Sequence, residues 1–265
     1  MATALITGGT SGIGLAFARL LAGRGYDIVL VARDAQRLEE TADKIASASG
    51  RRVETLPADL SDRGGVARVA ERLAADEQPI DLLVNNAGFG IHEPLASSDS
   101  AAHERAIEVM CRAVLVLGGT AAEKMASRER GMIINVSSTA GFLALGGYSA
   151  VKAWVTSYSE SLAVELRGTG VRVTALCPGW VRTEFHQRAG LSTSSIPSWL
   201  WTDSEHVVAT ALKDAARGKV ISIPTMRYRG LMWCVRHLPR GTVRAISGKI
   251  TSRRRTPRPE GEEAR

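Results

Sequence analysis

Two patterns of hydrophobic positions alternate along the chain: short β-branched or apolar runs, and longer stretches in which apolar residues recur every three to four positions. The short runs predict strands, and the longer stretches predict amphipathic helices. Because strands that alternate with helices form right-handed βαβ crossovers, we expect a doubly wound α/β fold with a mostly parallel sheet. The predicted strands are Ala2–Thr7, Asp27–Ala32, Val53–Pro57, Ile80–Asn85, Met132–Val136, Val171–Cys177 and Lys219–Ile223.

The alternation runs from residue 2 to about residue 223 without a linker rich in proline or serine. We therefore predict a single domain over residues 1–224, with a Ser-rich insertion that serves as a substrate loop over 184–202. Thr202 and Glu205 have capping-box spacing, which predicts that this loop ends there and that a helix covers Asp203–Ala216. Beyond it we expect a basic amphipathic helical extension over 225–250 and a disordered tail over 251–265.

The composition is that of a globular protein: 265 residues, of which 45% are hydrophobic and 23% charged. Its net charge of +7 could indicate an anionic partner, but the charge is unevenly distributed. Residues 225–265 hold eleven basic and three acidic residues, whereas the rest of the chain holds 23 basic and 24 acidic residues. Only the tail, residues 225–265, therefore gives a reason to consider a nucleic-acid or membrane partner.

The three cysteines are widely separated and show neither disulfide-framework nor zinc-site spacing, so we expect a reducing compartment. The five histidines show no metal-ligand spacing, and no metal is expected. No apolar stretch approaches the roughly 18 residues that span a bilayer. A glycine-rich motif that begins at Thr7 leaves no room for a signal peptide, so we expect a cytoplasmic protein.

That motif joins the first predicted strand to the first helix. It reads Thr7-Gly8-Gly9-Thr10-Ser11-Gly12-Ile13-Gly14. Glycines at this position allow a tight turn and let the backbone approach a pyrophosphate, which then lies on N–H groups at the helix N-terminus. A glycine-rich turn that only packs tightly is the alternative, and the strand–turn–helix context favours the nucleotide site.

Four further motifs follow in order, at strand ends or on the next helix: Asn85-Asn86-Ala87-Gly88, Ser137-Ser138, Tyr148-x-x-x-Lys152 and Pro178-Gly179-x-x-x-Thr183. With the glycine-rich motif, they make the chain over roughly residues 2–223 resemble the short-chain dehydrogenases/reductases. The resemblance implies a Rossmann-type three-layer αβα fold, a nicotinamide dinucleotide and reversible hydride transfer between a carbonyl and an alcohol. It also implies a small-molecule substrate, and a homo-oligomer is compatible with it.

The candidate catalytic residues are Ser138, Tyr148 and Lys152. Tyr148 and Lys152 are four positions apart, so they share one helix face, where the ammonium can stabilise a phenolate. A tyrosine pKa is ordinarily about 10, so work near neutral pH requires a large downward shift, which we expect Lys152 to supply. The resemblance implies that Lys152 also holds the nicotinamide ribose. It further implies that Ser138, the second serine of the pair, binds the substrate carbonyl. Ser137 is the competing assignment, and otherwise it satisfies backbone groups at the strand end.

Two features depart from the family pattern. The interval from Ser138 to Tyr148 is shorter than usual, which should reshape the substrate mouth. The asparagine that supports a proton relay in the family corresponds here to Met110. Either a backbone carbonyl and water complete the relay, or proton exchange is slow, so the catalytic set is at most a triad.

The end of the second strand indicates the cofactor. An acidic residue there would bind both ribose hydroxyls of NAD, but Ala32 takes that position and Arg33 can pair with a 2′-phosphate, so we predict NADP(H). Asp34 is the rival: it favours NAD if it reaches the ribose, and otherwise it caps the next helix. The expected cofactor-binding residues are Gly8, Thr10, Ser11, Gly12, Ile13, Gly14, Arg33, Asp59, Leu60, Asn86, Ala87, Gly88, Tyr148, Lys152, Pro178, Gly179, Val181 and Thr183.

Three interpretations of the basic tail stay open at this point. Its apolar faces pack over the substrate cleft or a neighbouring subunit, its basic helices rest on an anionic membrane, or its arginine cluster binds nucleic acid. The leading function is an NADP(H)-dependent oxidoreductase that acts on a hydrophobic or acyl-chain ketone. The alternative is a non-catalytic nucleotide-sensing or scaffold protein that keeps the fold, which the methionine at position 110 favours.

Overall fold

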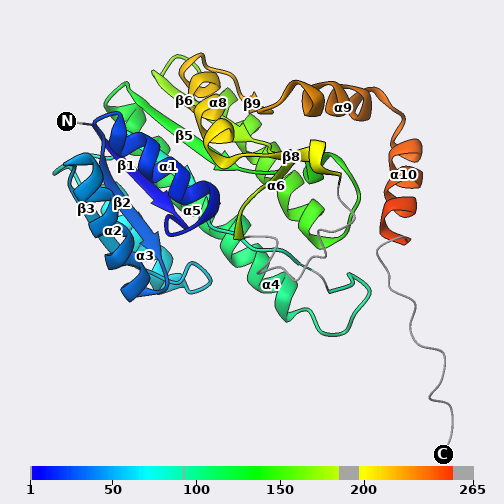
Figure 1. Ribbon diagram of the computed structural model, residues 1–265, viewed down its shortest axis with the longest axis horizontal. Helices are drawn as coiled ribbons and strands as arrows, with labels where there is room; N and C mark the ends of the chain where they lie inside the picture. The colour runs from blue at the N-terminus through cyan, green and yellow to red at the C-terminus, as the bar shows by residue number, and fades with distance from the viewer. Residues whose placement is uncertain (1, 92, 185–196, 253–265) are drawn as a thin grey trace, which may run out of the picture.

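The computed structural model describes residues 2–91, 93–184 and 197–252, and it contains a seven-stranded parallel sheet in the order β3-β2-β1-β4-β5-β6-β9 (Figure 1). The doubly wound α/β fold is therefore confirmed. Every predicted strand is present, with its bounds within two residues of the expected ones. The strands are β1 Thr3–Thr7, β2 Asp27–Ala32, β3 Val53–Pro57, β4 Leu82–Asn85, β5 Gly131–Val136, β6 Val171–Leu176 and β9 Ile221–Ser222.

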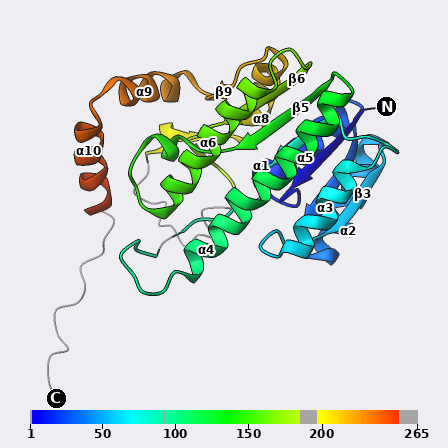
Figure 2. The ribbon, with the colours of Figure 1, turned by 180° about the vertical axis from the view of Figure 1, so that it is seen from behind.

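Helices cover both faces of the sheet. One face is covered by α1 (Gly12–Gly23), α2 (Ala35–Ser49) and α8 (Ser204–Ala216), which share one apolar cluster (Figure 1). The other face is covered by α3 (Arg63–Ala74), α5 (Ala113–Ser127) and α6 (Gly147–Glu165), seen from behind in Figure 2. This arrangement makes the three layers that the alternating sequence predicts.

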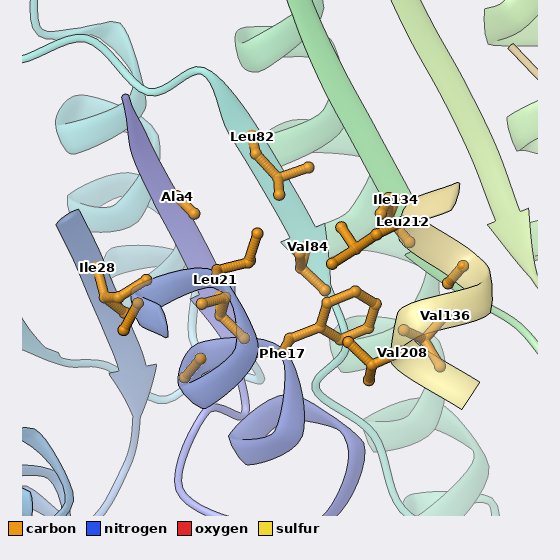
Figure 3. Close-up of a cluster of buried hydrophobic side chains, with 14 of the residues drawn as sticks. Ala4, Phe17, Leu21, Ile28, Leu82, Val84, Ile134, Val136, Val208 and Leu212 are labelled. Carbon is orange, nitrogen blue, oxygen red and sulfur yellow. The ribbon is translucent and has the colours of Figure 1, made fainter. Parts of the chain in front are cut away.

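Both faces of the sheet are buried because successive strand residues point in opposite directions. In β1, Ala4 and Ile6 join the cluster under α1, whereas Leu5 joins the cluster on the opposite face. Figure 3 shows Phe17 of α1 among side chains from the central strands and Val208 of α8. Strands of this kind read as continuous apolar runs, which explains why their bounds could be predicted closely.

The strand order reverses between β1 and β4, because β2 and β3 lie on one side of β1 and the later strands lie on the other. Ligands of open α/β sheets bind outside the carboxyl ends of the strands at this reversal. Here the two strand ends are Thr7 and Asn85. Two of the expected cofactor motifs therefore meet at one point of the fold.

Several short elements surround this edge of the sheet. Trp180–Val181 (β7) and Trp201–Thr202 (β8) pair in a small parallel sheet that the sequence analysis did not predict. The expected capping box is wrong, because Thr202 belongs to β8 and the N-cap of α8 is Asp203, whose carboxylate accepts a hydrogen bond from the Glu205 N–H. The other short elements are α4 Ala101–Ile107, a π-helix Glu108–Arg112, and 3₁₀ helices Thr139–Phe142 and Ser198–Leu200.

Two helices follow β9 and extend along one side of the molecule (Figure 1): α9 (Met226–His237) and α10 (Arg240–Ser252). Tyr228 and Met232 of α9 are buried, as are Val243 and Ser247 of α10. The tail therefore packs partly against the rest of the chain, and whether it covers the substrate cleft, as the first interpretation holds, stays a prediction. Residues 185–196, most of the expected insertion, and 253–265, most of the expected disordered tail, lie outside the described residues.

Candidate active site

The glycine-rich turn and the turn after β4 are held together by hydrogen bonds. The Thr7 hydroxyl accepts hydrogen bonds from the N–H groups of Asn86 and Ala87 at 2.9 and 3.0 Å. The Asn86 side-chain amide donates to the Thr7 and Gly8 carbonyls at 2.9 and 3.1 Å. A Cβ added at Gly14 would lie only 2.2 Å from the Gly8 carbonyl oxygen. The turn therefore has this shape because position 14 carries no side chain.

The residues present fit a dinucleotide. Helix α1 begins at Gly12, directly after this turn, and the Ser11 side chain makes no capping hydrogen bond to it. The first N–H groups of a helix have no acceptor within the helix, so they can bind a pyrophosphate. A Cβ at Gly12 would lie 3.3 Å from the Thr183 Cβ, so Thr183 lies against the glycine-rich turn, and its contact with nicotinamide stays a prediction.

The two serines after β5 point to different surroundings. Ser137 is buried, and its hydroxyl donates to the Lys152 carbonyl at 2.7 Å and lies 2.7 Å from the Thr156 hydroxyl. It therefore satisfies backbone of α6 rather than of the strand end. The Ser138 hydroxyl instead makes a hydrogen bond with Tyr148.

Tyr148 and Lys152 lie on one face of α6, as the four-residue spacing predicts. The Lys152 ammonium is 5.6 Å from the centre of the Tyr148 ring. It donates a hydrogen bond of 2.8 Å to the Val136 carbonyl at the end of β5, which holds the buried side chain beneath the tyrosine. Ser138, Tyr148 and Lys152 thus meet at the carboxyl edge of the sheet.

Burial shifts both titratable groups toward their neutral forms. It raises the pKa of Tyr148 to about 12, although the hydrogen bond with Ser138 acts in the opposite direction. It lowers the pKa of Lys152 to about 8. The downward shift expected for the Tyr148 pKa is therefore not present, because removing the phenolate from water outweighs the stabilising hydrogen bond from Ser138.

Met110 occupies the place expected for the relay asparagine. It is buried in the π-helix, and its sulfur lies 2.9 Å from the position that a Cβ of Gly88 would take. The Lys152 ammonium nitrogen lies 3.7 Å from this Gly88 Cβ position. A thioether accepts hydrogen bonds only weakly, so its side chain is a poor ligand for a relay water. Single-turn π-helices are frequent at functional sites, and this one interrupts the backbone pattern at position 110.

Three charged residues follow two neighbouring strands: Arg33 and Asp34 come directly after β2, and Asp59 lies just after β3. Arg33 is exposed, and its positive charge helps to lower the pKa of Asp59. Asp34 caps α2 by accepting a hydrogen bond from the Arg37 N–H at 3.0 Å. Helix capping is the role expected for Asp34 if it does not contact the ribose. Partial burial raises the pKa of Asp59, but hydrogen bonds from Ser61 and the charges of Arg33 and Arg105 outweigh this and hold it below its usual value.

Arg37 was not singled out in the sequence. Its guanidinium donates to the Thr10 carbonyl in the glycine-rich turn at 3.3 Å and to the Glu184 carboxylate at 3.0 Å. It lies in the first turn of α2, four residues beyond Arg33, and its place just after the second predicted strand is the signal that could have indicated it. Two arginines, not one, therefore lie at this side of the cofactor turn.

The turn after β6 connects the site to the tail. The Pro178 carbonyl accepts hydrogen bonds from Ser138 and Thr139, and Val181 is buried in β7. A Cβ at Gly179 would lie 2.0 Å from the Tyr228 ring, so Tyr228 of α9 packs directly on that glycine. The Tyr228 hydroxyl accepts from the Trp180 N–H at 3.1 Å and donates to the Leu200 carbonyl at 3.0 Å.

Comparison with known proteins identifies the family. The family model for short chain dehydrogenases matches residues 2–192. The chain is a short-chain dehydrogenase/reductase. As a member of this family it is an oxidoreductase that acts on CH–OH groups. The resemblance that the motifs indicated is therefore confirmed.

Individual relatives cover most of this short-chain dehydrogenase/reductase. A cis-4-hydroxycyclohexanecarboxylate dehydrogenase from Sinomonas cyclohexanicum is 38% identical over 68% of this chain and 73% of its own. A short-chain dehydrogenase from Sphingobium yanoikuyae, solved with NADPH, is 32% identical, with a TM-score of 0.80 and 99% of each chain covered. An alcohol dehydrogenase from Comamonas testosteroni specific for bulky-bulky ketones is 27% identical, with a TM-score of 0.76, and covers 99% of this chain and 97% of its own.

Two kinds of feature are absent from the part of the chain that the structure describes. No helix there is long and apolar enough to cross a membrane. No group of three or more histidine, cysteine, aspartate or glutamate side chains there is placed to hold a metal ion. His186, the histidine expected in the substrate loop, lies outside the described residues.

Proposed function

We propose that this enzyme interconverts a carbonyl and a secondary alcohol, with Tyr148 as the proton donor and acceptor. The observation that carries the proposal is the meeting of the Ser138 hydroxyl and the Lys152 ammonium at Tyr148. Ser138 would hold the substrate oxygen, and Lys152 would stabilise the phenolate that remains after proton transfer. NADPH, when bound, supplies the hydride.

The raised pKa of Tyr148 suits reduction of a carbonyl. A tyrosine with a pKa of about 12 is protonated near neutral pH and can give its proton to the alkoxide that forms. The reverse reaction needs the phenolate, so it depends on Lys152 keeping its charge. Met110 can take part in resupplying the proton only through its backbone carbonyl and a water, because its thioether is a weak acceptor.

Replacing Tyr148 by phenylalanine tests this proposal. We expect Tyr148→Phe to lower kcat for ketone reduction by about 10²- to 10⁴-fold, while NADPH still binds. Tyr158→Phe is a matched control, since Tyr158 lies on the same helix but its hydroxyl donates to the Leu115 carbonyl. Full activity in Tyr148→Phe would contradict the proposed role. Loss of activity in both variants would indicate a structural effect.

For the cofactor, we propose a preference for NADP(H). The exposed Arg33 offers a cation beside the turn, whereas Arg37 is paired with Glu184 and Asp34 is engaged in capping α2. The similar Sphingobium enzyme was solved with NADPH. Arg33→Ala should raise KM for NADPH at least tenfold and leave KM for NADH unchanged, whereas Arg68→Ala on the exposed face of α3 should change neither. A retained NADPH preference in Arg33→Ala would refute the assignment.

We further propose a hydrophobic substrate. Aromatic side chains gather on the short elements that follow β6: Trp180 and Trp201 form a tilted pair 5.8 Å apart, and Trp199 is 61% exposed. The Comamonas enzyme named for bulky-bulky ketones has the same overall fold. NADPH oxidation measured across ketones of increasing apolar size should show kcat/KM rising with size. A preference for small polar ketones would contradict this.

The tail supports a proposal about location. The enzyme would reside in the cytoplasm, consistent with the exposed thiol of Cys234, and touch an anionic membrane through the outward face of α9. On that face Met226 and Trp233 are 76% and 63% exposed, and residues 225–252 contain six Lys or Arg and no Asp or Glu. Two such faces would repel one another in a symmetric dimer, which favours a lipid surface.

Trp233→Ser tests the membrane contact better than deleting the tail, because deletion would also remove the buried Tyr228. Binding to phosphatidylserine vesicles should fall in Trp233→Ser and persist in Cys234→Ser, which changes a neighbouring exposed residue. Equal binding by the two variants, or a tail-dependent dimer in solution without vesicle binding, would refute the membrane contact.

A further inference from the structure

A basic pocket lies at the edge of the sheet, apart from all the residues of the proposed active site. Its volume is about 510 Å³, and it is bounded by α8, by the segments on either side of β9 and by the first turn of α9. Five Lys or Arg side chains and one histidine line it, against one carboxylate. The lining residues that carry charge or can acquire it are His206, Lys213, Asp214, Arg217, Lys219, Arg227 and Arg229.

The single carboxylate is already neutralised. Asp214 is buried, and it pairs with the Lys219 ammonium at 2.7 Å and with the Arg229 guanidinium at 3.4 Å. Its second oxygen also accepts a hydrogen bond from the Ser222 hydroxyl at 2.9 Å. Lys213 and Arg217 have no ion pair with any carboxylate of the described residues. The pocket therefore keeps an excess of positive charge after its internal pairs are formed.

The start of α9 opens into the same pocket. Thr225 is the N-cap residue and has the extended backbone usual for a cap, but its side chain does not cap the helix. Its hydroxyl oxygen is buried and has no hydrogen-bond partner. Thr225, Met226 and Arg227 all line the pocket. A buried hydroxyl without a partner and the start of a twelve-residue helix, whose first N–H groups have no acceptor within the helix, thus belong to residues of this wall.

Helix-end electrostatics explain only part of this arrangement. Lys213 and Arg217 lie at the C-terminus of α8, where cations stabilise the helix dipole. Lys219 and Arg229 are accounted for by their ion pairs with Asp214, but neither effect accounts for the uncapped start of α9 and the unpartnered Thr225 hydroxyl. The combination of cations, helix N-terminus and unused hydroxyl is the one that binds phosphate groups in proteins.

We propose that this pocket binds a phosphate group, either free or as part of a phosphomonoester or lipid headgroup. Lys213 and Arg217 would supply the charge-assisted hydrogen bonds, and the Thr225 hydroxyl with the first N–H groups of α9 would complete the site. The proposal is independent of the catalytic assignment, because none of these residues belongs to the catalytic or cofactor set.

The test is a titration of the full chain with inorganic phosphate, in the presence of saturating NADPH so that the cofactor turn is already filled. Binding measured by calorimetry should weaken at least tenfold, or about 1.4 kcal/mol, in Lys213→Ala/Arg217→Ala. Thr225→Val, which keeps the shape of the side chain, should weaken it by a smaller factor. The matched control is Arg240→Ala/Arg244→Ala, which removes the same charge from exposed positions of α10.

A second arm distinguishes the source of the phosphate. Vesicles of phosphatidylcholine with phosphatidic acid are compared with phosphatidylcholine alone, using the same variants. Free phosphate binding that is lost only in the pocket variants supports a soluble ligand. Binding to phosphatidic acid vesicles that is lost only in those variants, without free phosphate binding, supports a lipid headgroup. Equal effects in pocket and control variants, or no binding of either probe, would overturn the proposal.

Discussion

The cofactor side and the substrate side of the site are held together in different ways. On the cofactor side, the glycine-rich turn and the turn after β4 are joined through Thr7 and Asn86, and an added methyl group would meet backbone atoms. On the substrate side, side chains of the tail hold the loops in place. Tyr228 packs on Gly179, and the Ser247 hydroxyl accepts a hydrogen bond from the Ala144 N–H. The cofactor side is thus constrained by backbone shape, and the substrate side by side chains that can vary.

The largest expected effect tests the cofactor side. Gly14→Ala would place a Cβ 2.2 Å from the Gly8 carbonyl oxygen and 2.5 Å from the Asn86 amide nitrogen, so the turn must open. Overpacking of this kind costs about 1–3 kcal/mol, and the Kd for NADPH should rise about 10- to 100-fold in a fluorescence titration. Gly23→Ala, at the end of the same helix with open space around it, should leave Kd unchanged.

The next effect concerns Tyr148 and Lys152, which lie between the cofactor side and the substrate side of the site. As pH rises, Lys152 with a pKa of about 8 loses its proton before Tyr148 with a pKa of about 12. The positive charge that stabilises the phenolate is then lost, so kcat/KM for ketone reduction should fall above pH 8, by up to about tenfold per pH unit. Lys152→Arg should extend the active range to higher pH, since a guanidinium keeps its charge. A flat profile up to pH 10 would contradict this.

A smaller effect tests the substrate side. Gly179→Ala would place a Cβ inside the Tyr228 ring, so α9 must shift. We expect the free energy of unfolding to fall by about 1–3 kcal/mol, measured in urea. Gly230→Ala, in α9 with nothing near it, should instead be neutral or stabilise the protein by up to about 1 kcal/mol. Equal stability of these two variants would show that Tyr228 does not hold the tail in place.

The smallest effect concerns the proton relay. Met110→Asn should raise kcat a few-fold by offering an amide to a relay water, at a cost of about 1–3 kcal/mol in unfolding free energy because position 110 is buried. Met110→Leu, of similar volume, should leave kcat unchanged. An unchanged solvent isotope effect on kcat in Met110→Asn would indicate that a backbone carbonyl already supplies the relay.

Much of the fold could be predicted from local patterns. The bounds of β2 and β3 agree with the predicted ones, because strands buried on both faces read as unbroken apolar runs. The capping box predicted at Thr202 was wrong because a long-range contact overrides the local pattern. Its spacing is correct, but Thr202 pairs with Val181 in a two-residue strand that no local pattern marks. The upward shift of the Tyr148 pKa was also missed, because burial is a property of the folded chain.

The sequence by itself determined the individual strands, the glycine-rich turn and the shared face of Tyr148 and Lys152, since each depends on neighbours within a few residues. Only the tertiary structure decided which backbone group Ser137 satisfies, how Tyr228 covers Gly179 and where the basic pocket forms. These features join residues far apart in the chain, such as Trp180 with Tyr228, 48 positions later, and Ala144 with Ser247, 103 positions later. Their geometry follows from how the helices pack on the sheet, which no local periodicity encodes.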